Sequence, residues 1–330
     1  MVTAPAGDGR FLGVDIGGTS IKWSVVRGGV VEASGEVATP RTGQHAVLRT
    51  VADLATGISG ALSGIGMAVP GTVDTVRRRS LVLPNLPGDW NGLAAADEVE
   101  RLVGLPVALL NDARAFAWAE LTGGAARGVS SAQFVTLGTG VGGAIAFHGE
   151  VLMGETDSIG EIGHTTVDPD GVPCPCGGHG CLETVASGTA IVGRLARAFA
   201  LAQSPILQRL TNGGADPLTA RIAADAARLG DPWATEAFDR AAAALGRAAA
   251  TIGVLLLLDV VVIGGGLRPA ADLYLPAVQR ALDERTSLSG PIEARSAHLG
   301  TEAGSIGAAA FAAARLADPS TTRNRERNHL

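Results

Sequence analysis

A short glycine-rich turn near the start of this 330-residue chain could hold a phosphate group. Asp15 ends an apolar run and is followed by Gly17, Gly18 and Thr19. Glycines let backbone N–H groups approach a phosphate closely, and the Thr19 hydroxyl is a further donor. Asp15 would then lie where Mg²⁺ bridges phosphate oxygens through water. The same residues would equally form a plain hairpin turn with Gly-Gly at its tip.

A second glycine-rich turn, residues 138–143, also stands between two strand-like runs. A nucleotide bound between two domains would need a phosphate cradle from each side. Gly138, Thr139 and Gly140 could supply the second cradle. The repetition of this arrangement favours two related α/β halves.

A third glycine cluster, residues 264–266, follows a β-branched strand. The absence of side chains at Gly265 and Gly266 would suit the face of an adenosine. No cluster has the G-x-G-x-x-G pattern that opens a helix or the P-loop pattern, and Lys22, the only lysine, lies within a strand. Any phosphate site must therefore use backbone amides, hydroxyls, arginine or a metal.

The strongest metal signal is the spacing His-x9-Cys-x-Cys-x4-Cys formed by His164, Cys174, Cys176 and Cys181. One histidine and three cysteines complete a tetrahedral Zn²⁺ shell, which predicts a structural ion that orders a loop. An odd number of crowded cysteines does not suit a disulfide framework. The alternative is three reduced thiols in a loop. His179 is a competing imidazole, but its place within the loop predicts a surface residue.

Carboxylates flank this loop and also end a buried strand. Glu161 and Glu183 could accept hydrogen bonds from the hydroxyls of a polyhydroxylated ligand. Asp112 could accept a proton from an attacking hydroxyl while Asn111 holds the substrate. Asn-Asp is also a common arrangement at a helix N-terminus. Nothing in the sequence forms a Ser/His/Asp or Cys/His nucleophile set.

The elements that must position these residues alternate between short apolar strands and helical periodicities, which predicts an α/β fold. Strands are expected at residues 11–15, 21–26, 30–37, 65–69, 107–110, 133–137, 144–147 and 260–263, and helices at 46–62, 113–120 and 306–316. The strand ends are where ligands bind in such sheets. The polar tail, residues 318–330, is expected to be disordered.

Composition excludes several classes of protein. With 26 Lys and Arg against 32 Asp and Glu, the net charge of −6 argues against nucleic-acid binding, and 46% hydrophobic residues argue against disorder. The longest apolar run, residues 252–263, is too short to cross a membrane and contains Asp259. The N-terminus lacks the regions of a secretory signal, so a cytoplasmic protein without membrane partners is expected.

Taken together, these residues resemble the ROK family of bacterial sugar kinases, and within it the actinobacterial ATP-dependent glucokinases. The resemblance covers residues 11–316, and its most specific part runs from Gly163 through the cysteines to Thr189. It implies an actin-like, hexokinase-like (ribonuclease H-like) pair of α/β domains closing over a cleft. Residues 1–112, joined by a returning helix at about 303–317, would form the small domain, and residues 113–302 the large domain with the zinc loop.

The resemblance also implies roles for individual residues. Asp112 would be the general base that takes the proton of the sugar 6-hydroxyl during transfer from Mg-ATP. The sugar hydroxyls would be bound by Gly71, Asn85, Asn111, Asp112, Glu161, His164 and Glu183. The nucleotide would be bound by Asp15, Gly17, Gly18, Thr19, Gly138, Thr139, Gly140, Gly265 and Gly266. Relatives imply a homodimer or homotetramer whose ligands are a sugar and ATP.

The chain departs from the commonest family pattern at Arg114, where many members have Asn, and at Ala144, where a third glycine is frequent. The alternatives within the same chemistry are kinases for N-acetylglucosamine, N-acetylmannosamine, allose or fructose, and polyphosphate as donor. A non-catalytic sugar sensor is a different class. The ten residues before Phe11 leave no room for the DNA-binding domain of the family's repressors, which disfavours this alternative.

Overall fold

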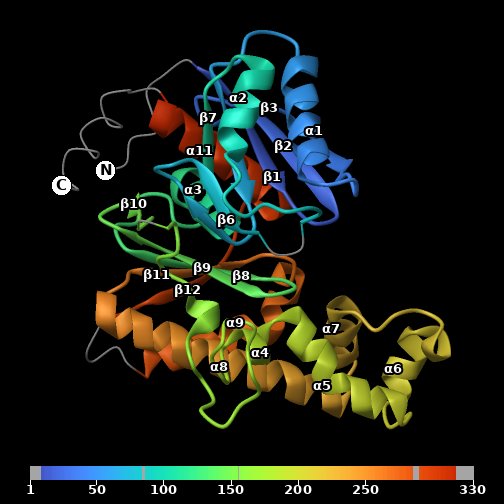
Figure 1. The fold of residues 1–330 in the computed structure, drawn as a ribbon. Coiled ribbons are helices and arrows are strands. Elements are labelled where there is room, and N and C mark those ends of the chain that lie inside the picture. Colours follow the sequence, from blue (N-terminus) through green and yellow to red (C-terminus); the bar gives the residue numbers. More distant parts are fainter. Residues whose placement is uncertain (1–8, 84–85, 155, 285–289, 317–330) are drawn as a thin grey trace. The chain divides into compact units, whose positions relative to one another are not determined.

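The computed structural model describes residues 9–83, 86–154, 156–284 and 290–316 (Figure 1). Within these residues the chain forms two compact units. The first contains the residues up to Gly128, the segment His148–Ile159 and the residues from Thr301 onward. The second contains Val129–Phe147 and Gly160–Gly300.

The first unit is built on a five-stranded mixed sheet with the order β3-β2-β1-β4-β7. The strands are β1 (Arg10–Ile16), β2 (Ser20–Arg27), β3 (Val30–Ala38), β4 (Gly64–Val69) and β7 (Val107–Asn111), and the separate hairpin is β5 (Thr72–Asp74) and β6 (Arg79–Val82). Strand β1 runs antiparallel to β2 and parallel to β4. Its apolar side chains Leu12 and Val14 are fully buried, which explains the continuous apolar run in the sequence.

The helices of the first unit are α1 (Gln44–Gly57), α2 (Ala95–Val103), α3 (Asp112–Gly123) and α11 (Ala303–Leu316). The C-terminal helix α11 lies against the N-terminal strands β1 and β2, and against α3 (Figure 1). A Cβ at Gly13 would stand 2.6 Å from Ala309 N, so glycine permits this close approach. Helix α1 ends before residue 62, the predicted end, because Ile58 leaves the helical conformation after Gly57.

The second five-stranded sheet has the order β10-β9-β8-β11-β12, and four of its strands belong to the second unit. These four are β8 (Ala132–Leu137), β9 (Val141–Phe147), β11 (Val260–Gly264) and β12 (Glu293–Ser296), whereas β10 (Glu150–Val151) is part of the segment His148–Ile159 that groups with the first unit. The α-helices of the second unit are α4 (Glu183–Ala186), α5 (Gly188–Ala200), α6 (Pro205–Leu210), α7 (Ala220–Arg228), α8 (Pro232–Leu256) and α9 (Ala271–Asp283). Short 3-10 helices are η1 (Ile162–His164), η2 (Asn212–Gly214), η3 (Arg268–Ala270) and η4 (Gly300–Glu302). Helices α8 and α9 pack together over an alanine-rich core.

Both sheets repeat one arrangement. An antiparallel hairpin, β1–β2 or β8–β9, is followed in the sheet by two parallel strands, β4–β7 or β11–β12. The sequence predicted this repetition from two glycine turns. The second turn is shorter than predicted, because residues 141–143 already belong to β9 and only residues 138–140 form the turn.

The division into units differs from the boundary predicted after Asp112. Helix α3 packs against α11 and therefore groups with the first unit, as does the segment His148–Ile159. The predicted disordered tail, residues 318–330, lies outside the described residues. Among the described helices, none combines the length and apolar character that crossing a bilayer requires.

Candidate functional site

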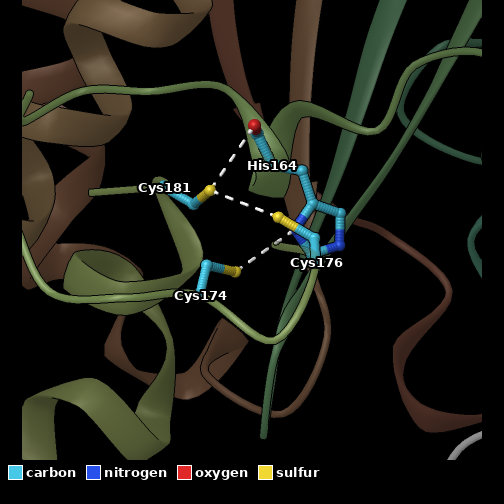
Figure 2. A group of neighbouring side chains, drawn as sticks. All are labelled: His164, Cys174, Cys176 and Cys181. Carbon is cyan, nitrogen blue, oxygen red and sulfur yellow. Dashed lines mark hydrogen bonds between the residues drawn. The ribbon is translucent and has the colours of Figure 1, made fainter. Parts of the chain in front are cut away.

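The four predicted metal ligands lie together in the second unit (Figure 2). Their donor atoms are all within 4.8 Å of one another. The Sγ atoms of Cys176 and Cys181 are 3.6 Å apart, as are Cys174 Sγ and His164 Nδ1. A tetrahedral zinc ion with Zn–S bonds of about 2.3 Å sets neighbouring sulfurs about 3.8 Å apart. The donor set and its spacing therefore fit zinc.

Local backbone contacts explain why the ligands converge. Cys174 N–H donates to Gly178 O, and Leu182 N–H donates to Thr165 O, which closes the loop at two levels. Gly180 has φ of +58°, and a Cβ there would overlap Asp168 O, so only glycine fits. His179 is exposed and stands outside the cluster, as the sequence predicted.

The protein environment perturbs two of the thiols in opposite directions. Burial raises the pKa of Cys181 to about 12. The Gly178 backbone N–H lowers the pKa of the exposed Cys176. Because zinc binds thiolates, loading this site would release protons to solvent.

The other predicted ligand-binding residues of the second unit lie directly beside this loop in sequence. Glu161 immediately precedes η1, and His164 ends it with Nδ1 directed at the cluster. Glu183 begins α4 and accepts the Val141 N–H at 2.8 Å through Oε2. A Cβ at Gly140 would clash with that carboxylate. Glu183 thus contacts the second glycine turn, which the sequence had not indicated.

In the first unit, Asn111 and Asp112 stand at the junction of β7 and α3. Asn111 is the N-cap of α3, since its Oδ1 accepts the N–H groups of Ala113 and Arg114. Its Nδ2 donates to Gly71 O at 2.7 Å. Asp112 is the first residue of the helix, where the helix dipole favours a carboxylate. The side chain of Asn111 thus caps α3, while Asp112 begins the helix.

The Asp15 turn of the first unit is a tight hairpin. Gly17 N–H donates to Ser20 O, Thr39 Oγ1 donates to Gly17 O, and Thr39 N–H donates to Thr19 O. Burial raises the pKa of Asp15 from 3.8 to about 6, and the charge of Lys22, its cross-strand partner, acts in the opposite direction. Gly18 lies within the same turn.

The second glycine turn lies against two other glycine-containing segments. Gly188 N–H donates to Gly138 O at 2.8 Å, and Thr189 Oγ1 donates to Thr139 O at 2.9 Å. Gly265 has φ of +85°, and a Cβ there would stand 2.6 Å from Leu137 O. A Cβ at Gly188 would press on Gly138 O, and one at Gly265 would press on Leu137 O, so a side chain at Gly188 or Gly265 would displace the turn.

A cavity of about 520 Å³ opens beside these segments, entirely within the second unit. Its walls include Gly138, Thr139, Gly188, Thr189, Gly266 and Arg228. This is the size range of small-ligand sites. The sequence predicted Gly138, Thr139 and Gly266 as ligand-binding residues, whereas Gly188, Thr189 and Arg228 were missed. The signal in the sequence for Thr189 was the helix start after the cysteines. Ser187 is the N-cap of α5, which places Thr189 in the first turn of that helix.

The predicted site residues divide between the units. The first unit contains Asp15, Gly17, Gly18, Thr19, Gly71, Asn111 and Asp112, and the second contains Gly138, Thr139, Gly140, Glu161, His164, the three cysteines, Glu183, Gly265 and Gly266. Asn85, a predicted sugar ligand, lies outside the described residues. In the first unit the structure joins Asn111 to Gly71 by a hydrogen bond. In the second unit it places Glu183 against Gly140 and Val141.

These sites occur in a chain whose family is clear. The sequence model of the ROK family matches residues 11–315. The chain belongs to the ROK family, and the predicted class of fold, two mixed α/β domains of the actin-like kind, is confirmed.

Several relatives are similar over nearly their whole length. A glucokinase of Thermotoga maritima is 34% identical over 314 residues, which are 93% of this chain and 98% of that protein. An N-acetylmannosamine kinase of Yersinia pseudotuberculosis is 33% identical over 311 residues, 93% of this chain and 100% of that protein. A ROK family glucokinase from Streptomyces griseus, solved in complex with glucose and AMPPNP, has a TM-score of 0.79 and 34% identity, covering 92% of this chain and 99% of that one.

Proposed function

We propose that this protein is an ATP-dependent glucokinase that transfers the γ-phosphoryl group of ATP to the 6-hydroxyl of D-glucose. The observation that carries the proposal is the cavity in the second unit. It is lined by Gly138, Thr139 and Gly266, three of the residues that the sequence predicts as nucleotide contacts. The similarity to a glucokinase crystallised with glucose and AMPPNP supports the same assignment.

In this mechanism Asp112 is the general base. Its carboxylate accepts the proton of the sugar 6-hydroxyl while the hydroxyl oxygen attacks the γ-phosphorus, and the bond between that phosphorus and the ADP oxygen breaks. The Ala113 N–H donates to Asp112 Oδ1 at 2.8 Å and so orients the carboxylate. Asp112 also lies in the first turn of α3, at the positive end of the helix dipole.

The remaining ligand contacts follow from the same proposal. Gly71, Asn85 and Asn111 of the first unit and Glu161, His164 and Glu183 of the second would bind sugar hydroxyls. The two glycine turns would donate backbone N–H groups to the phosphates, with Thr19 and Thr139 as hydroxyl donors. Mg²⁺ bound with ATP neutralises phosphate charge, and Asp15 is the residue that would hold it.

The cluster of His164, Cys174, Cys176 and Cys181 would hold a structural zinc ion. Four protein ligands leave no open position for a water, so the ion would order the loop and take no part in the chemistry. With Nδ1 of His164 directed at the cluster, Nε2 is the ring nitrogen available to a sugar hydroxyl.

A kinase for N-acetylmannosamine is the second candidate, because the relative with that activity is as similar as the glucokinases. An ADP-release assay separates the two. The purified protein is tested against glucose, mannose, N-acetylmannosamine, N-acetylglucosamine, allose and fructose, with ATP and with polyphosphate as donors. The proposal requires the highest kcat/KM for glucose with ATP. A preference for N-acetylmannosamine would favour the second candidate, and no turnover with any sugar would support a sensor.

A further inference from the structure

A buried ion pair contacts Asn111, the residue immediately before the proposed base. The side chains of Arg114 and Asp157 are both fully buried, with Nε and Oδ1 3.6 Å apart. Desolvating two charges costs several kcal/mol per ion, so a buried pair of this kind is weak evidence for stability. Its contacts point to another role.

Both charged groups hold Asn111. Arg114 Nη1 donates to Asn111 Oδ1 at 3.0 Å, and Asp157 Oδ2 accepts the Asn111 backbone N–H at 2.6 Å. Arg114 Nη2 also donates to Ile159 O at 2.8 Å, which ties the segment that carries Asp157 to α3. The pair therefore hydrogen-bonds to both the side chain and the backbone of Asn111, the residue immediately before Asp112.

These contacts determine which way the Asn111 amide points. Its Oδ1 accepts from three N–H groups, those of Ala113 N, Arg114 N and Arg114 Nη1. Its Nδ2 donates to Gly71 O. Guanidinium and backbone N–H groups can only donate, and a carbonyl oxygen can only accept, so the opposite orientation would break every contact.

The orientation limits what Asn111 can offer a ligand. An amide oxygen has two lone pairs, which the three donors already occupy. The amide nitrogen has two hydrogens, of which Gly71 O takes one. One N–H remains, and Asn111 can therefore present a hydrogen-bond donor but no acceptor.

We propose that Arg114 and Asp157 are positioning residues that hold Asn111 as a donor to one sugar hydroxyl oxygen. The inference rests on the proposed function and adds a specificity determinant to it. A sugar that lacks the hydroxyl facing Asn111 loses a hydrogen bond and leaves a buried N–H without a partner. Arg114, the departure from the common family pattern, would thus set the discrimination at one ring position.

The test measures kcat/KM for glucose and its 2-deoxy, 3-deoxy and 4-deoxy analogues. Asn111→Asp keeps an oxygen for the helix cap and removes the donor, so it identifies the ring position that Asn111 reads. At that position the parent should lose about 10- to 100-fold in kcat/KM with the deoxy sugar. Arg114→Gln and Asp157→Asn should reduce this loss to a few-fold and leave the losses at the other positions unchanged.

Two further variants keep the test decisive if a single substitution unfolds the protein. The double variant Arg114→Gln/Asp157→Asn removes both charges of the pair together. Asp231→Asn is the matched control, because Asp231 is a buried N-cap residue of α8 in the second unit. It should lower the melting temperature without changing deoxy-sugar discrimination.

The outcomes separate the two proposals. An active parent whose discrimination survives in the folded double variant would overturn the role of Arg114 and Asp157 alone. A parent that phosphorylates none of the sugars would overturn the proposed function, and this inference with it. Loss of discrimination at the Asn111 position, with ATP KM within about twofold of the parent, supports both.

Discussion

The two units repeat one strand order, but their glycine hairpins differ at equivalent positions. Asp15 stands one residue before the end of β1 and faces Lys22 across the hairpin, whereas Thr136 stands at the same place in β8 and faces Gly142. The first hairpin therefore carries a carboxylate and an ammonium group, and the second is neutral. A cavity lies beside the second, where Gly188 and Thr189 hold the turn.

This difference shows that two sheets with the same strand order can carry different side chains at equivalent turns. The sheet order places a turn at the same edge of each unit, and the side chains that follow decide its chemistry. In the first unit, polar groups gather at the ends of β1 and β7, at Asp15 and Asp112. In the second unit, glycines line a cavity, and the cluster of one histidine and three cysteines lies in a nearby loop.

The largest predicted effect comes from removing the proposed base of the first unit. Asp112→Asn should lower kcat by about 10²- to 10⁴-fold, because no carboxylate then accepts the hydroxyl proton, while the sugar and ATP still bind. Steady-state kinetics measures kcat, and a titration with glucose measures sugar binding. Asp97→Asn, a half-exposed acidic residue in the first turn of α2, is the control. Turnover near the parent rate in Asp112→Asn would show that the base lies elsewhere.

The next effect tests the ordering role of the cysteine cluster in the second unit. Cys176→Ala should abolish stoichiometric zinc and lower glucose affinity by at least about tenfold, because the loop beside Glu161 and Glu183 loses its cross-link. Metal analysis and calorimetric titration with glucose provide the readouts. Val172→Ala, exposed in the same loop, should retain zinc and affinity. A parent protein purified without zinc would contradict the assignment.

A smaller effect should appear in nucleotide binding when the second turn is displaced. Gly265→Ala should raise the KM for ATP about tenfold, equivalent to about 1.4 kcal/mol, because its Cβ would press on Leu137 O. Gly230→Ala is the matched control, since Gly230 also has positive φ but a Cβ there meets nothing within 4 Å. Equal ATP KM values in the two variants would argue against a nucleotide in this cavity.

The smallest effect concerns the stability of the first hairpin. The folded protein holds the Asp15 proton up to about pH 6, whereas an ordinary carboxyl releases it near 3.8. The folded state thus binds more protons between these values, and the parent loses stability as the pH rises through them. Asp15→Asn removes this loss and should be about 1–2 kcal/mol more stable than the parent at pH 7.5, because the partly exposed carboxylate keeps some of its solvation.

Thermal or urea unfolding at pH 4 and at pH 7.5 measures this difference. The advantage of Asp15→Asn should shrink towards zero at the lower pH, where both states of the parent are largely protonated. Asp53→Asn, exposed on α1, controls for the loss of a charge. An advantage that is equal at both pH values would show that burial of the Asp15 charge is not its cause.

Much of the fold was predictable from local pattern. The fully buried strands appear in the sequence as short apolar runs, and β4 and β7 begin and end within a residue of their predicted limits. Helix α1 was predicted too long, because apolar residues continue at helical spacing after Gly57 has ended the helix. The second glycine turn was predicted too long because glycines also occur inside β9.

The sequence by itself determined the metal donor set and the family, because ligand chemistry and motif spacing are properties of residues close together in the chain. Only the tertiary structure decided that Asp157 and Arg114 hydrogen-bond to Asn111, and that Glu183 accepts the N–H of Val141, directly after the Gly138–Gly140 turn. These contacts join residues more than forty positions apart or depend on a side-chain orientation that burial enforces. Burial decides them because a desolvated charge or amide must find its partner wherever the fold brings one within reach.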